Sequence, residues 1–449
     1  MTSGSADPVT AFIVAAVVPR GSSHASGDTT GAERMLSAHP GVAKASIYTA
    51  AILGDDATVK SFIARDATNA TAKGGPYEWD ALTHLCFSNY LKHDRSRTDG
   101  FVSAATALLD AGASANTGWW EPNDYPYPQW EPALYGACGV AQHPEMTRLL
   151  LERGANPNDD EVVYHSPEGW DNAAMKILVE TGKITSDNLS LMLIRKHDFH
   201  DYEGARYLLE HGADPNGVRS RGWYPMHHAL ARGNAIEMFR LLLDHQADPM
   251  VVNAGLTAVA RAAREGRNDV LALFEERGIT VALEGVDRLI AACARDDADA
   301  IRSITAQEPG LAAEVLAMGG TLVAKFTGGW NAEGVRRLLD LGVPPTTPFV
   351  EGDGYFGIPE GSLPIHVAAW RAQPAIVKLL IERGSPVDVP DARGRTPLTL
   401  AVKACVDSYW TGRRTPESVR ALLEAGASTV GVPYPSGYDE VDALLQARR

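Results

Sequence analysis

The residues best suited to chemistry lie close together near the middle of the chain. One short segment contains two histidines, two aspartates and a lysine, namely Lys196, His197, Asp198, His200 and Asp201. On one side of a helix, or around one turn, an imidazole and a carboxylate could act as a general acid–base pair. An aspartate would orient the histidine and Lys196 would supply positive charge. His228 is a further candidate, and Trp170 and Trp223 would exclude water.

The same segment has a simpler structural explanation. It falls where a repeated helix should end, and a polar turn there would satisfy neighbouring backbone groups. A metal is not expected, because the histidines lack a third ligand at standard spacing and the cysteines are isolated. We therefore predict no metal and no cofactor. We expect the four cysteines to be small buried apolar residues: Cys86, Cys138, Cys293 and Cys405.

Aromatic residues form the second group of candidates. Residues 117–130 form an aromatic-rich insertion, which would project on the concave side of a repeat array. Aromatic side chains dominate interface energetics, so this insertion is either a binding lip or a loop folded back over its own groove. We expect function to concentrate over residues 77–230. The candidate binding residues there are Trp79, His84, Trp119, Trp120, Tyr125, Tyr127, Trp130, Tyr135, Tyr164, His165, Trp170, Trp223 and His228.

A repeated structural unit must position these residues. A Leu-Leu-x-x-Gly-Ala element recurs at 108–113, 150–155, 208–213 and 422–427, with weaker copies between them. Each unit predicts a short first helix that begins near a proline and a second helix that is closed by glycine. Neither helix can bury its apolar side alone. Stacked copies must therefore share one continuous core.

The repeat resembles the ankyrin repeat, whose pattern is Thr-Pro-Leu-His-x-Ala-Ala followed by Leu-Leu-Leu-x-x-Gly-Ala-Asp-x-Asn. Residues 154–158, 212–216 and 393–398 are near this consensus. The chain is thus similar to ankyrin repeat-containing proteins, of a bacterial type. The resemblance implies an all-α, elongated and curved solenoid of about eleven stacked helix-turn-helix units with helical caps. It also implies that His227 and His366 tie their turns to neighbouring turns.

The resemblance sets the expected domain organisation. We predict an N-terminal helical cap over residues 1–44, the repeat array over residues 45–430 and a C-terminal capping helix over residues 431–449. The aromatic insertion at 117–130 and a second insertion at 349–361 interrupt the array.

Charge and composition exclude several classes of partner. Lys and Arg number 41 against 56 Asp and Glu, which gives a net charge of −15. Such a field repels phosphate backbones and anionic lipids, so we expect neither a nucleic-acid nor a membrane partner. The longest apolar run, residues 9–18, is too short to span a bilayer. We expect a soluble, cytoplasmic protein.

Two functions follow from these features. The first is a non-enzymatic scaffold that holds a partner protein or a ligand in its concave groove, with the acidic charge favouring a basic partner. The second is a small-molecule site or an acid–base enzyme in the same groove, built from the His, Asp, Lys and Trp residues above. The fold does not decide between them, because function lies in the site.

Overall fold

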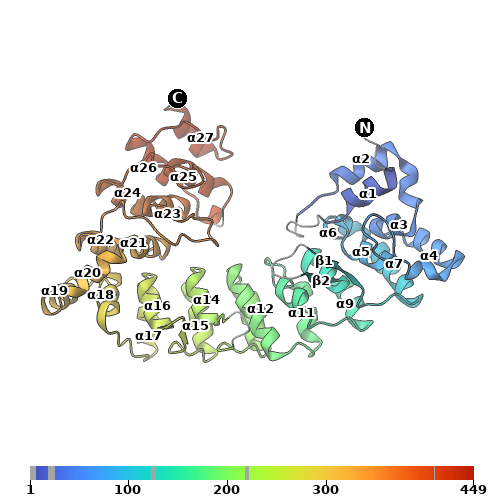
Figure 1. The fold of residues 1–449 in the computed structure, drawn as a ribbon, viewed down its shortest axis with the longest axis horizontal. Helices are drawn as coiled ribbons and strands as arrows, with labels where there is room; N and C mark the ends of the chain where they lie inside the picture. Colours follow the sequence, from blue (N-terminus) through green and yellow to red (C-terminus); the bar gives the residue numbers. More distant parts are fainter. Residues whose placement is uncertain (1–6, 19–25, 123–127, 218–221, 409, 449) are drawn as a thin grey trace. The chain divides into compact units, whose positions relative to one another are not determined.

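The computed structural model of the protein describes residues 7–18, 26–122, 128–217, 222–408 and 410–448. The chain forms two compact units, Met1–Pro225 and Met226–Arg449, here called unit 1 and unit 2. Within each unit, pairs of helices follow one another in chain order (Figure 1).

The described part of unit 1 contains two N-terminal helices and five helix pairs. The N-terminal helices are α1 (Pro8–Ala16) and α2 (Thr30–Ala38). The first helices of the pairs are α3 (Ile47–Leu53), α5 (Ala81–Cys86), α8 (Ala133–Tyr135) with the π-helix η4 (Gly136–Val140), α10 (Asp160–His165) and α12 (Ser186–Asp198). The second helices are α4 (Asp56–Arg65), α7 (Thr98–Asp110), α9 (Pro144–Glu152), α11 (Ala173–Glu180) and α13 (Tyr202–Glu210). The connections contain α6 (Asn89–His93), η1 (Pro40–Lys44), η2 (Ala67–Ala70) and η3 (Arg95–Arg97).

The described part of unit 2 contains six further pairs. The first helices are α14 (Pro225–Ala231), α16 (Ala258–Arg264), α18 (Gly285–Ala294), α21 (Gly319–Gly328), α23 (Pro364–Trp370) and α25 (Pro397–Val406). The second helices are α15 (Ile236–Asp244), α17 (Asn268–Glu276), α19 (Ala298–Gln307), α22 (Ala332–Asp340), α24 (Pro374–Glu382) and α26 (Glu417–Glu424). Three elements lie outside the pairs: α20 (Gly310–Ala317), η5 (Thr411–Arg413) and the last helix, α27 (Asp439–Gln446). The predicted helical fold, with helices paired in stacked repeats, is confirmed.

Two short antiparallel hairpins depart from the all-α prediction. The aromatic insertion forms β1 (Gly118–Glu121) and β2 (Gln129–Pro132), in which Trp120 lies opposite Trp130. The other hairpin pairs β3 (Val252–Asn253) with β4 (Leu256–Thr257). Both lie in connections between helix pairs, where the helical period of the repeat makes no prediction.

A recurring left-handed residue turns the chain from the first helix of a pair into the second. This position has φ between 47° and 69° at Gly54, Gln142, His200, Gly233, Gly266, Asp296, Trp330 and Ala372. Glycine adopts this conformation readily, whereas other residues pay a conformational cost. His200 therefore stands at a turn position that several other repeats give to glycine.

Polar side chains link successive repeats as the sequence predicts. Nε2 of His227 lies 2.9 Å from the carbonyl oxygen of Val251, and Nε2 of His366 lies 2.8 Å from that of Val389. The four cysteines are free and buried, and burial raises the pKa of the Cys293 thiol to about 12. They pack as small core residues, as expected.

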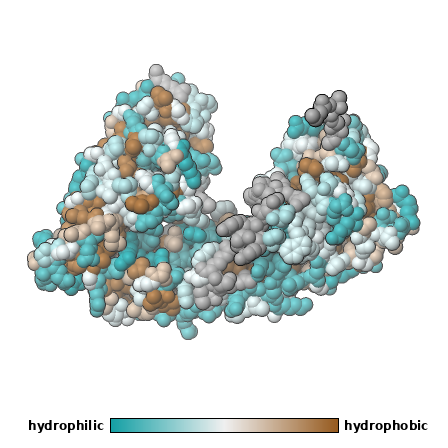
Figure 2. Space-filling model, viewed as in Figure 1, coloured by the Kyte–Doolittle hydropathy of each residue, from teal (hydrophilic) through white to brown (hydrophobic). Residues whose placement is uncertain are grey.

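Two further features are the distribution of surface residues and the length of the apolar helices. Hydrophilic residues are spread over the visible face of both units, with apolar residues between them (Figure 2). Among the described residues, no single helix is long and apolar enough to cross a membrane. Helices α20 and α21 together satisfy the length and composition, but they bend by 69° at their junction.

Asn331 joins three repeats and provides a test of this stacking. Its Oδ1 accepts from Gly334 N at 2.7 Å and caps α22, while its Nδ2 donates to the carbonyl oxygens of Gly266 and Ala294 at 2.8 and 2.6 Å. Asn331→Ala is expected to lower the free energy of unfolding by about 2 to 4 kcal/mol, because it removes a cap and leaves two carbonyls unpaired. Urea denaturation measures the change.

The matched control is Asp297→Ala, which removes the exposed cap of α19 alone. It is expected to cost about 1 kcal/mol. Equal losses in the two variants would contradict a stacking role for Asn331.

Candidate functional site

The segment around Lys196 ends α12 and fastens a neighbouring loop. Lys196 is fully buried, and its Nζ lies 2.9 Å from Oδ2 of Asp201 and donates to the carbonyl oxygen of Gly169 at 3.0 Å. Asp201 also caps α13 by accepting from Gly204 N at 3.0 Å, and it accepts from Asn172 Nδ2 at 2.8 Å. Burial opposes ionisation of Asp201, but Lys196 outweighs it and lowers the pKa of that carboxyl. The ion pair ties the loop 166–172 to the start of α13.

The other aspartate of the segment is also engaged in an ion pair. Asp198 accepts from Arg195, whose Nη2 contacts Oε1 of Glu168 at 2.7 Å. His197 is buried, and His200 occupies the left-handed turn. These contacts favour the explanation of the segment as a helix end and polar turn. His228, the remaining acid–base candidate, is buried on α14 in unit 2.

Four of the predicted binding residues are instead buried between repeats of unit 1. They are Trp79, His84, Trp119 and Tyr135. The ring of Trp79 lies 4.9 Å from that of Trp119 and 5.3 Å from that of His84. Burial lowers the pKa of His84 to about 4, so it is neutral at physiological pH. These residues pack repeat against repeat and are not accessible to a partner, because neighbouring repeats cover them.

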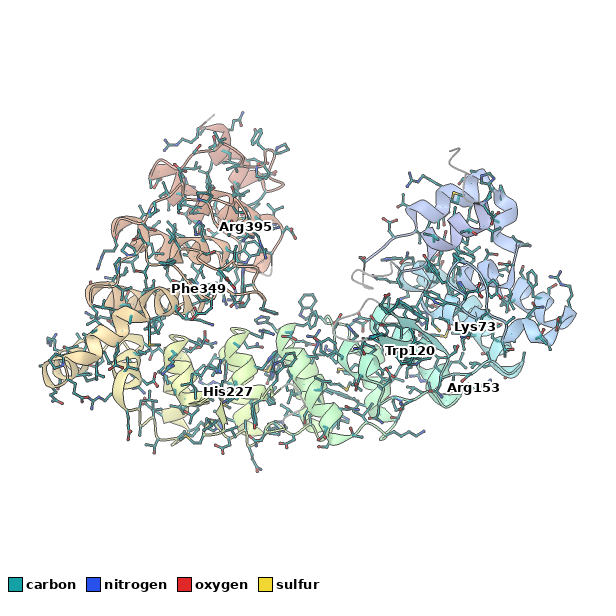
Figure 3. The ribbon with its side chains drawn as sticks, viewed as in Figure 1. Lys73, Trp120, Arg153, His227, Phe349 and Arg395 are labelled. Atoms are coloured by element: carbon teal, nitrogen blue, oxygen red, sulfur yellow. The ribbon has the colours of Figure 1, made fainter. Side chains whose placement is uncertain are left out.

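The aromatic insertion divides its residues between core and solvent. Side chains alternate along a strand, so Trp119 is 5% exposed whereas the adjacent Trp120 is 61% exposed. Trp130 is half-buried opposite Trp120, with the two ring centroids 5.4 Å apart. Figure 3 labels Trp120. Tyr125 and Tyr127 lie outside the described residues. One face of the hairpin therefore packs on the core and the other faces solvent.

A charged network lies beside this hairpin. Nδ1 of His165 is 2.8 Å from Glu168 Oε1, and its Nε2 is 3.1 Å from Glu161 Oε2. Burial opposes protonation of His165, but the hydrogen bonds to Glu161 and Glu168 outweigh it and raise its pKa to about 9. The Arg195 guanidinium lies 4.0 Å from the ring centre of Tyr164. The imidazole is thus held as a cation in an ion-pair network.

Two predicted tryptophans lie outside the core of unit 1. Trp170 is 70% exposed in the loop 166–172, and its ring meets that of Phe199 edge-on at 6.4 Å. Trp223 is half-buried just before α14. Trp120 and Trp170 are therefore the most exposed of the predicted binding residues that the structure describes.

A pocket in unit 2 was not predicted from the sequence. It lies at the C-terminal ends of first helices and beneath the second insertion, and it is partly open to solvent. Charged residues of the lining are Glu265, Arg267, Lys325, Asp353 and Arg371. Apolar and glycine residues complete it: Leu230, Ala231, Gly233, Ala324, Gly328, Gly329, Phe349, Phe356, Ile358 and Val367. The only sequence signals were the insertion itself and an arginine immediately after Ala368, Ala369 and Trp370.

The described residues contain no cluster of three or more His, Cys, Asp or Glu side chains that could hold a metal ion.

Comparison with known proteins identifies the repeat. A family model of ankyrin repeats in three copies matches residues 191–284, and a second ankyrin repeat model matches residues 358–401. Solved structures that match include the crystal structure of the human ASB11 ankyrin repeat domain, with 20% sequence identity and a TM-score of 0.23. That match covers 53% of this chain and 98% of the other. No curated protein matches the sequence.

The division of the hairpin can be tested by a pair of substitutions. Trp119→Ala is expected to lower the free energy of unfolding by about 3 to 5 kcal/mol, because it opens a cavity beside Trp79. Trp120→Ala is expected to change it by less than about 0.5 kcal/mol, because the ring is mostly exposed. Chemical denaturation of the two variants measures both changes. Comparable losses would show that the two faces of the hairpin are not distinct.

The His165 network predicts a pH dependence of stability. A histidine whose pKa is raised on folding stabilises the protein fully below its unfolded pKa of about 6.5, and this stabilisation is lost as pH rises through about 9. His165→Gln is therefore expected to cost on the order of 3 kcal/mol at pH 6 and much less above pH 9. Denaturation midpoints across this range test it. A pH-independent difference between variant and wild type would contradict the assignment.

Proposed function

We propose that this ankyrin repeat-containing protein is a binding scaffold that recognises a partner protein through exposed aromatic residues of unit 1. The observation that carries the proposal is the exposure of Trp120 and Trp170, at 61% and 70%. Tryptophan is enriched among the residues that contribute most to protein–protein affinity. Ankyrin repeats are generally protein-binding scaffolds, which agrees with this assignment.

Both tryptophans are held on ordered supports. Strand β2 contacts α10, and the buried Trp119 anchors the other face of the hairpin. Lys196 and Arg195 fasten the loop that carries Trp170, through Gly169 and Glu168. A partner would therefore meet side chains whose backbone is already fixed, which lowers the entropic cost of binding.

The net charge of −15 favours a partner with a basic surface. We further propose that the partner lies along the first helices of unit 1, which in this fold class line the concave groove. The acid–base alternative has less support, because Asp198 and Asp201 already pair with Arg195 and Lys196.

Double substitution of the exposed tryptophans tests the proposal. Proteins captured from the source cells by the wild-type chain are purified, and their affinities are measured by calorimetry. Trp120→Ala combined with Trp170→Ala is expected to weaken binding of the true partner at least about 30-fold, equivalent to about 2 kcal/mol. The thermal unfolding midpoint is expected to stay within a few degrees of wild type, because both side chains are exposed.

Trp330→Ala, at a tryptophan of unit 2 that is 42% exposed, is the matched control. It is expected to leave the affinity for the partner unchanged. Full binding by the double variant, or an equal loss in the control, would refute recognition through this surface.

A further inference from the structure

The pocket of unit 2 contains a buried arginine next to two aromatic rings. Arg371 follows α23 directly and is 5% exposed. Its guanidinium contacts two neighbouring aromatic rings, 4.0 Å from the ring centre of Phe356 and 4.7 Å from that of Trp410. The rings thus offer the cation favourable contacts but no hydrogen-bond acceptor for its N–H groups.

One of these edges is unpaired. Among the residues that the structure describes, Nε and Nη2 of Arg371 have no hydrogen-bond acceptor. These two atoms form the side of the guanidinium that presents two parallel N–H donors. A buried charged donor without an acceptor is strongly unfavourable. Arg371 therefore lowers the stability of the folded chain, and stacking of the repeats does not require it.

The other charged groups of the pocket are already engaged. Glu265 pairs with Lys325 at 3.2 Å, and Arg267 pairs with Asp269 at 2.7 Å. Asp353 accepts from Phe356 N at 3.2 Å. No carboxylate of the described chain lies within ion-pair distance of Arg371. Burial lowers the pKa of Arg371 to about 10, opposed by Asp353 and Glu265, so the side chain is still a cation at neutral pH.

Neighbouring glycines pack closely against this arginine. A Cβ atom at Gly233 would lie 2.6 Å from Nη2, and one at Gly328 would lie 3.0 Å from Nη1, so a side chain at Gly233 would displace the guanidinium. These residues come from α21 and from the turn after α14, so distant parts of unit 2 meet at one guanidinium.

The second insertion covers the pocket and is itself fastened. It closes through backbone hydrogen bonds from Phe349 N to Ser362 O and from Asp353 N to Ile358 O, both 2.8 Å. Trp370 Nε1 donates to the carbonyl oxygen of Phe356, and Arg395 Nη2 to that of Gly357, both at 2.7 Å. Figure 3 labels Phe349 and Arg395 in unit 2. The insertion therefore forms a fixed wall of the pocket.

We propose that this pocket binds a carboxylate attached to an apolar group, with the two carboxylate oxygens accepting from Nε and Nη2 of Arg371. A carboxylate matches the spacing of these two donors and neutralises the buried charge. Apolar residues in the lining, among them Phe349, Ile358 and Val367, suit the group that carries it. The site lies in unit 2 and is independent of the protein-binding surface proposed for unit 1.

The lining also favours a single negative charge over a phosphate dianion. Glu265 and Asp353 belong to the same pocket, and their carboxylates would repel a second negative charge on the ligand. The carboxylate has two chemical sources, a free organic acid or the C-terminus of a peptide. Both offer the same pair of oxygens to Arg371.

Calorimetric titration of the full chain tests the proposal with matched ligands. The probes are isocaproate against isocaproamide, and an acetylated tripeptide ending in leucine with a free or an amidated C-terminus. Inorganic phosphate is the competing anion. Carboxylates are expected to bind about 10- to 100-fold more tightly than their amides, because charge-assisted hydrogen bonds are lost in the amide. Tighter binding of the tripeptide than of isocaproate would identify a polypeptide source, and the reverse a free acid.

Variants then assign the binding to Arg371. Arg371→Met is expected to abolish carboxylate binding while its thermal unfolding midpoint stays equal to or above that of the wild type, since a buried unpaired charge is removed. Arg371→Lys keeps the positive charge but lacks the two parallel N–H donors of the guanidinium. It is expected to bind the carboxylate at least about tenfold more weakly than the wild type does. Arg240→Met, at an exposed arginine of α15, is expected to bind as wild type does.

Several results would overturn the proposal. They are the absence of carboxylate binding to the wild type, equal affinity for carboxylate and amide, and undiminished binding by Arg371→Met. Tighter binding of phosphate than of either carboxylate would also overturn it. If Arg371→Met fails to fold, the comparison of carboxylate with amide in the wild type and the Arg371→Lys variant still decide the matter.

Discussion

The structure depends on one constraint, which is that no helix pair can bury its apolar side without the next pair. The core is therefore continuous along each unit, and every repeat must match its neighbours in shape and in hydrogen bonding. Polar residues carry much of this matching. Asn331 reaches carbonyls of two preceding repeats, and His227 and His366 hold the turns beside them. The same requirement explains why Trp79, His84 and Trp119 are buried.

Residues that do not have to pack against a neighbouring helix pair are found in the insertions and in the turns. One face of the hairpin of unit 1 packs on the core through Trp119. The other face does not pack on the core, and Trp120 is exposed there. The second insertion similarly packs on unit 2 and walls a pocket. Both features lie between a second helix and the following first helix, because the chain can lengthen there without disturbing the core.

The two units differ in how their buried charged side chains are paired. In unit 1, Lys196, Asp201, Arg195 and Glu168 form buried or half-buried ion pairs that secure a loop. In unit 2, Arg371 is buried against two aromatic rings with one donor edge unpaired. A satisfied ion pair is explained by the fold alone, whereas an unsatisfied buried cation calls for a ligand.

The sequence by itself determined the repeat, the helix pairs and the burial of the cysteines, because each follows from local spacing of apolar residues, prolines and glycines. It also drew attention to the aromatic insertion. Only the tertiary structure decided which face of that insertion is exposed, because strand register depends on contacts with Trp79 and α10. It likewise paired Lys196 with Asp201. The Arg371 pocket could not be predicted, because Gly233 and Arg371 are far apart in the chain and meet only when the repeats of unit 2 stack.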